Sequence, residues 1–181
     1  MKAIIKSVPI LCALFSPVIF ACEKPASVCF QDNEGLPLIS DGQPLPIIIS
    51  PSADSAVKRV AEAFSQDIQR VGGKPADISQ NQSISQPAVI IGVLGEDALI
   101  DELVQKGKLD VSQIKGQWEA YKIAVVEKPM PDVEHALVIV GADRRGAIFG
   151  TFEISEQMGV SPWYWFADVP TEQKSNVFIT A

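Results

Sequence analysis

The chain has 181 residues, of which 22 are acidic and 15 are basic, so its net charge at neutral pH is −7. This charge gives no electrostatic basis for binding nucleic acid or an anionic membrane surface. An anionic polysaccharide would likewise be recognised only through locally placed arginines or lysines. The length of the chain is sufficient for one domain with its own hydrophobic core.

Residues 1–21 have the pattern of an export signal. Lys2 and Lys6 form a basic start, and residues 8–20 are an apolar stretch that is too short, and too broken by two prolines, to cross a bilayer as a stable helix. We therefore expect an exported protein, periplasmic or extracellular. Loss of this leader removes two lysines and no acidic residue, which leaves a net charge of −9.

The leader can be processed in two ways, and the sequence leaves both open. Cleavage after Ala21 fits a small-residue site, whereas residues 19–22 also look like a lipobox, in which Cys22 would be acylated as in an outer-membrane lipoprotein. A lipid on Cys22 would leave Cys29 as a lone thiol. Without the lipid, the two cysteines can close a small disulfide.

Residues 22–44 are rich in proline, glycine and polar side chains, and we predict an irregular N-terminal segment. Its apolar pieces at 28–30 and 36–39 can form edge strands joined by a turn at 32–35. Residues 45–170 are predicted to form an α/β domain that starts with a buried strand at 45–50.

Three helices are expected in that domain. Ser52 or Asp54 caps the first, whose apolar side chains keep helical spacing up to Gly72 and Gly73: Val57, Val60, Ala61, Phe64, Ile68 and Val71. Glu96 or Asp97 opens the second helix, which ends at Gly107, and the third follows Asp143 and ends at Gly159.

Strands are predicted at 88–93, 121–125 and 136–140 in addition to 45–50. Strand-to-helix units favour parallel pairing, but the link at 129–134 is too short for a helical crossover. We therefore predict an α/β fold with a mixed sheet of about four to five strands and about three helices.

The turn from Gly92 to Gly95 follows a strand, as phosphate-binding turns do. It lacks a third glycine at the right spacing and a well-placed ribose-binding acid. We favour an ordinary tight turn between strand and helix over nucleotide binding, and no cofactor is expected.

The start of the third helix carries the residues most suggestive of a function. Asp143 is placed to cap the helix, whereas Arg144 and Arg145 oppose its dipole, so a partner is expected to compensate at least one of them. A salt bridge to a neighbouring domain is favoured over a sugar carboxylate. Gly146 and Gly150 share one face and predict a close approach to the sheet or another element.

Several other side chains are candidates for core, binding or catalytic roles. Ile148, Phe152, Ile154 and Met158 are predicted to be core. Trp163 and Trp165 lie in an aromatic run, residues 163–166, that can stack on sugar rings or form an interface, and we favour the interface. His135 is the only histidine and has no nucleophile in a recognisable context, so no catalytic or metal site is expected.

Several segments resemble one known family. They read GKLDVS (107–112), WEAY (118–121), GADRRG (141–146), SE (155–156), GVSPWYW (159–165) and ADVP (167–170). Together they are similar to the N-terminal domain of glycoside hydrolase family 115.

The resemblance implies a xylan α-1,2-glucuronidase that releases glucuronic acid or its 4-O-methyl ether from glucuronoxylan with inversion, by two carboxyl groups about 6.5–9.5 Å apart. In the family these groups lie in a (β/α)8 barrel after this domain, so residues 171–181 are expected to begin a linker to a missing barrel. No catalytic residue carries over, and Asp143 and Glu153 are not assigned that role. Another exo-glycosidase remains open.

Two other interpretations remain. The chain can be a non-catalytic carbohydrate-binding module that uses Arg145, Trp163 and Trp165, or a truncated remnant without activity. Glucuronoxylan, reached through the missing domain, is the expected partner. A membrane would be contacted only through the lipid anchor.

Overall fold

The computed structural model describes residues 26–31, 35–80, 85–163 and 169–180. Its elements follow in the order β1 (Ser27–Cys29), β2 (Leu36–Ser40), β3 (Gln43–Pro44), β4 (Ile47–Ile49), α1 (Ser55–Gly72), β5 (Ile78–Ser79), β6 (Ala88–Val93), α2 (Ala98–Gln105), β7 (Tyr121–Met130), β8 (Val133–Gly141), α3 (Arg144–Gln157) and β9 (Val177–Thr180). No helix in this described part has both the length and the apolar character needed to cross a membrane.

The larger sheet has the strand order β5-β4-β6-β8-β7. β5, β4, β6 and β8 run parallel, and β7 pairs antiparallel with β8 across the short link between them. The mixed sheet and the three helices predicted from the sequence are therefore confirmed. β5 has only two residues and was not predicted from the sequence.

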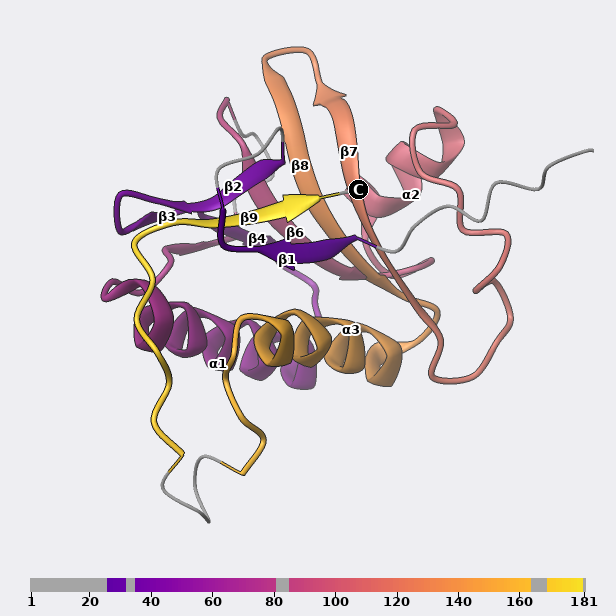
Figure 1. Cartoon of the computed structure of the whole chain (residues 1–181). Coiled ribbons are helices and arrows are strands. Elements are labelled where there is room, and N and C mark those ends of the chain that lie inside the picture. The colour runs from indigo at the N-terminus through magenta and orange to yellow at the C-terminus, as the bar shows by residue number, and fades with distance from the viewer. Residues whose placement is uncertain (1–25, 32–34, 81–84, 164–168, 181) are drawn as a thin grey trace, which may run out of the picture.

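The helices cover both faces of this sheet. α1 and α3 lie side by side on one face, as Figure 1 shows, and α2 packs on the opposite face. Asp54 caps α1 through a hydrogen bond accepted from the backbone N–H of Ala56, and Gly73 ends that helix with a φ of 85°. The caps predicted at Asp54 and Asp97 are both present.

A smaller antiparallel sheet, with the order β1-β9-β2-β3, packs on the same side as α1 and α3. β1 and β2 do not pair with each other, because β9 lies between them and pairs with both. The described parts of residues 22–44 are thus more regular than predicted. Residues 177–180 were expected to belong to a linker. They instead form β9, a strand near the end of the chain that pairs with β1 and β2 near its start.

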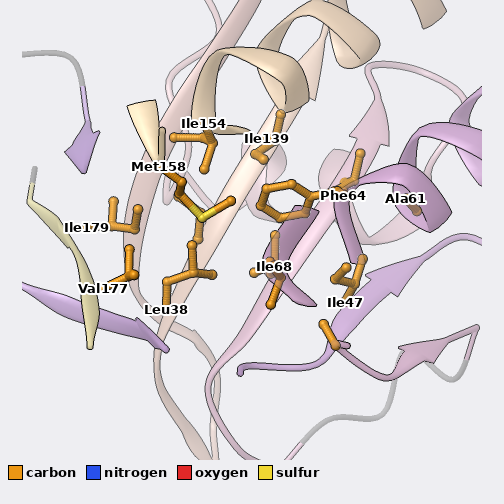
Figure 2. Packing of buried hydrophobic residues seen from close by; sticks show 14 of the residues in the cluster. Leu38, Ile47, Ala61, Phe64, Ile68, Ile139, Ile154, Met158, Val177 and Ile179 are labelled. Atoms are coloured by element: carbon orange, nitrogen blue, oxygen red, sulfur yellow. The ribbon is translucent and has the colours of Figure 1, made fainter. Parts of the chain in front are cut away.

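The main core lies between the larger sheet, the α1–α3 layer and the smaller sheet. Figure 2 shows Phe64 and Ile68 of α1 facing Ile139 of β8, with Leu38 and Ile179 of the smaller sheet beyond them. All five side chains are fully buried. The smaller sheet therefore closes one end of the core and is part of the same domain.

The core prediction for α3 is only partly right. Ile154 and Met158 are buried, and Ile148 is half-buried. Phe152, which was also predicted to be core, is 47% exposed, because the sheet is contacted by the opposite side of the helix. The apolar residues of α3 lie on more than one side of the helix, and the fold buries only one of these sides.

Candidate functional site

The carboxyl ends of β4, β6 and β8 meet at one edge of the larger sheet. The helix that follows β6 lies on one face, and the helices that follow β4 and β8 lie on the other. In open α/β sheets, ligands bind where consecutive helices change face in this way. This edge is therefore the place in the fold where a binding site is expected.

A shallow depression of about 10 Å³, room for about one water molecule, lies between the ends of β4 and β6. Its lining comprises Ser50, Ala53, Asp54, Val57, Gly92, Val93, Glu96 and Asp97. Small-molecule pockets usually enclose about 300–1,000 Å³, so this depression is too small for most ligands.

The groups in the depression already have structural roles. The buried carboxylate of Asp97 accepts hydrogen bonds from the backbone N–H groups of Leu99 and Ile100, which caps α2. A Cβ atom on Gly92 would lie 2.8 Å from Cγ1 of Ile100. The glycine at position 92 is thus required by the packing of α2, which supports the interpretation of residues 92–95 as a tight turn.

Asp143 occupies the same edge, at the start of α3. One carboxylate oxygen accepts a hydrogen bond of 2.8 Å from the backbone N–H of Gly146, and the other accepts one of 2.9 Å from the backbone N–H of Glu119. Those two backbone donors lower the pKa of Asp143 below its usual value. Asp143 therefore caps the helix and also holds the loop before β7.

The loop before β7, residues 118–120, packs closely against α3. Glu119 adopts a positive φ of 58°, and the carbonyl oxygen of Ala120 accepts a hydrogen bond of 2.8 Å from the backbone N–H of Ala142. A Cβ atom on Gly146 would lie only 2.1 Å from the same carbonyl oxygen. Gly146 is the residue that permits this contact.

Gly150 lies one turn further along the same face of α3. A Cβ atom there would lie 2.9 Å from Cδ2 of Tyr121 and 3.0 Å from Cγ2 of Ile139. The close approach that the two glycines suggested in the sequence is thus to β7, to β8 and to the loop before β7.

The two arginines at the start of α3 have partners within the chain. Nη1 of Arg144 lies 3.6 Å from Oδ2 of Asp54, and Nη1 of Arg145 lies 3.0 Å from Oε1 of Glu119. Both arginines thus find compensation without a neighbouring domain, and a contact with such a domain stays a prediction. Both pairs are largely exposed, so each contributes little to stability.

Arg145 is also flanked by aromatic rings. Its guanidinium carbon lies 5.9 Å from the ring centre of Trp118 and 5.8 Å from that of Phe149. Neither ring was predicted from the sequence to belong to a site. The spacing of Arg145 and Phe149, one helical turn apart, was the available signal for Phe149, whereas nothing local linked Trp118 to them.

Of the remaining predicted residues the structure describes Trp163 and His135, and neither has an ion pair or ring contact with Arg145. Trp163 is 65% exposed, and its backbone N–H donates to the hydroxyl of Ser161. Trp165, Cys22 and the export signal lie outside the described residues. His135 is exposed on β8, and the described residues contain no group of three or more His, Cys, Asp or Glu side chains that could hold a metal ion.

Comparison with known proteins gives a likeness to solved structures. No protein-family model matches the sequence, and no curated protein matches it. The structure of a family GH115 4-O-methyl-α-glucuronidase, BtGH115A, described as specific for decorated arabinogalactans, is similar with a TM-score of 0.65 and 33% sequence identity. The match covers 81% of this chain and 17% of that enzyme.

A second structure, that of CpGH84D, is similar with a TM-score of 0.47 and 13% sequence identity. The match covers 86% of this chain and 22% of that protein, and the likeness is too low to support an argument. The chain thus spans a small part of the length of the enzyme it resembles. We conclude that its fold is similar to that of a portion of a GH115 enzyme, which relates it to the glycoside hydrolases.

Proposed function

We propose that this chain is the N-terminal accessory domain of an exported family GH115 α-glucuronidase. The observation that carries the proposal is the likeness to BtGH115A, with 33% identity over 81% of this chain. The sequence segments that resemble the family include those that build the start of α3, where Asp143, Gly146 and the loop at 118–120 fit together. This agreement supports a shared local structure as well as a shared fold.

The proposed reaction is hydrolysis with inversion, which needs one carboxyl group to protonate the leaving oxygen and another to activate water. Four carboxylates at this edge of the larger sheet already have structural roles in this domain. Asp97 and Asp143 cap helices, Asp54 caps α1 and faces Arg144, and Glu119 pairs with Arg145. We therefore assign the two catalytic carboxyl groups to a (β/α)8 barrel that follows this domain, and a structural role to the domain itself.

The proposed product is glucuronic acid or its 4-O-methyl ether, released from a plant polysaccharide. Glucuronoxylan is the substrate implied by the resemblance of the sequence to the family. The specificity of BtGH115A for decorated arabinogalactans makes those polysaccharides the second substrate class to test. Export by the signal at residues 1–21, with or without a lipid on Cys22, would bring the enzyme to either polymer.

A non-catalytic carbohydrate-binding module is the second candidate. It is favoured by the position of Arg145 beside the exposed ring of Trp118, since aromatic faces stack on sugar rings and a guanidinium binds carboxylates. The pairing of Arg145 with Glu119 weighs against it, because an incoming uronate would have to compete with that carboxylate.

The coding DNA beyond the codon for Ala181 separates the two candidates. The enzyme proposal predicts an open frame that continues for several hundred residues with barrel-type strand and helix repeats. A stop codon at that point would refute it. The binding-module proposal then predicts that the chain is retarded in native gels containing xylan or arabinogalactan, and that Trp118→Ala abolishes the retardation.

A further inference from the structure

The outer side of α3 carries an aromatic surface that the fold leaves uncovered. Phe149 and Phe152 are 41% and 47% exposed and follow Arg145 at spacings of four and seven residues, so the three share one side of the helix. Trp118, which is 79% exposed, lies against Arg145 from the neighbouring loop. We call these four residues the α3 outer face.

This surface is not a by-product of core formation. The inner side of α3 is already complete, with Ala147, Gly150, Thr151 and Ile154 buried against the sheet. Single exposed apolar residues are normal on a protein, but adjoining large aromatic side chains mark a contact surface. Three of the large apolar side chains exposed in the described part of the chain belong to this one face.

The charges of the face argue for a protein partner over an acidic polysaccharide. Arg145 is paired with Glu119, Arg144 is paired with Asp54, and Asp143 adds a further negative charge beside them. This arrangement leaves no surplus of positive charge for a uronate. Phenylalanine, tryptophan and arginine are the residues enriched in the cores of protein interfaces.

The position of the face indicates which protein. α1 and α3 form a layer on one side of the molecule, and the described parts of the connection from α3 to β9 extend beyond that layer, away from both sheets (Figure 1). Trp163, also exposed, belongs to this connection. The similar enzyme has most of its length outside the matched portion, so polypeptide to cover such a layer is available in that architecture.

We infer that the α3 outer face is the surface on which the catalytic domain of the same polypeptide packs. This inference rests on the proposed function, because it requires that domain to exist. Contacts between domains of one chain usually bury about 600–1,500 Å², and Trp118, Phe149 and Phe152 would form the apolar centre of such a contact. Arg145, flanked by Trp118 and Phe149, would form with Glu119 a charge pair that fixes the relative orientation of the domains.

Hydroxyl-radical footprinting tests the inference. The product of the continued reading frame is compared with the 181-residue chain, both at low micromolar concentration, with the masses of both samples determined by light scattering. We expect the modification rates of Trp118, Phe149 and Phe152 to be at least about fivefold lower in the long product. Phe30, which is 42% exposed and lies outside the face, is the internal control and should react equally in both samples.

Equal modification of the three residues in both samples would overturn the inference. It would also be overturned if protection in the short chain rose with its concentration, which would indicate a second copy, or appeared only with added polysaccharide, which would indicate a glycan site. A long product that releases uronate but leaves the face fully reactive would refute the docking surface alone. A protected face without uronate release would refute only the proposed activity, and a frame that ends at Ala181 would refute both.

A double variant, Phe149→Ser with Phe152→Ser, supplies a second test that does not depend on labelling. In the 181-residue chain these exposed positions should tolerate serine, with little change in the midpoint of thermal unfolding. In the long product we expect the protection of Trp118 to fall at least threefold. Unchanged protection in the long double variant would contradict the inference. Gln105→Ser, an exposed change on α2 at the opposite face of the larger sheet, is the control and should leave the protection of Trp118 unchanged.

Discussion

Replacement of Gly146 by alanine tests the account of the loop that is packed against α3. By helix propensity alone, alanine inside a helix is about 1 kcal/mol more favourable than glycine. In this structure, however, the new Cβ atom would lie 2.1 Å from the carbonyl oxygen of Ala120 and 2.9 Å from its carbonyl carbon. The obstacle is backbone, so no change of side-chain rotamer can relieve it.

The size of the effect follows from what has to move. The loop must shift by about an ångström, and overpacking of this kind costs about 1–3 kcal/mol. The shift also strains the hydrogen bond from Ala142 to Ala120 and the one from Glu119 to Asp143, at about 1 kcal/mol in all. After the gain in helix propensity, Gly146→Ala should lower the free energy of unfolding by about 1–3 kcal/mol.

Thermal and urea denaturation of the chain without residues 1–21 measure this loss, which should appear as a decrease of about 2–12 °C in the melting temperature. Gly150→Ala is the matched control on the same helix face. Its Cβ would meet the side chains of Tyr121 and Ile139, which can adjust, so its stability should change by less than about 1 kcal/mol. A Gly146→Ala variant as stable as the native chain would refute the described packing.

Three further predictions concern single side chains. Asp143→Asn leaves one carbonyl oxygen to accept from the two backbone N–H groups now bound by the carboxylate, so the free energy of unfolding at pH 7 should fall by about 1 kcal/mol. The pKa of Asp143 is lowered in the fold. The difference between the variant and the native chain should therefore disappear as the pH falls from about 5 through that lowered pKa. Burial raises the pKa of Asp67, against the opposing effects of Ser155 and Arg70, so its contribution to stability should decline as the pH rises through the usual range of an aspartate to the raised pKa. Asp67→Asn should therefore increase the melting temperature at pH 7 and not at pH 3, and a lower melting temperature at pH 7 would show that the ion pair with Arg70 outweighs the burial. Phe64→Ala, at a fully buried position of α1, should cost about 3–5 kcal/mol in urea denaturation, and a loss under 1 kcal/mol would contradict the described core.

The larger sheet and its helices could be predicted because their signals are local. Asp54 and Asp97 cap helices whose apolar residues recur at helical spacing, and the short link between β7 and β8 excludes a crossover. The smaller sheet could not be predicted in the same way. Its central strand, β9, pairs with β1 across 153 positions of sequence, and no local pattern specifies such a partner.

In the candidate site, too, features with a local signal could be predicted and contacts between residues distant in sequence could not. Glycines at 146 and 150 indicated a close approach of α3 to another element, but the sequence did not show that the loop at 118–120 makes the first contact. The helix dipole correctly indicated that the arginines need compensation, yet their partners Asp54 and Glu119 are distant in sequence. Phe152 was misassigned because periodicity shows which residues share a side of a helix and not which side is covered.

The measurement that tests the proposed function most directly is the release of uronic acid by the product of the continued reading frame. Glucuronoxylan and decorated arabinogalactan are incubated separately with that product, and the released sugars are identified by chromatography and mass spectrometry. The account predicts free glucuronic acid or its 4-O-methyl ether from at least one polymer, with inverted anomeric configuration in the first moments of the reaction, and none from the 181-residue chain alone. Absence of uronate from both polymers, with a folded long product, would contradict it.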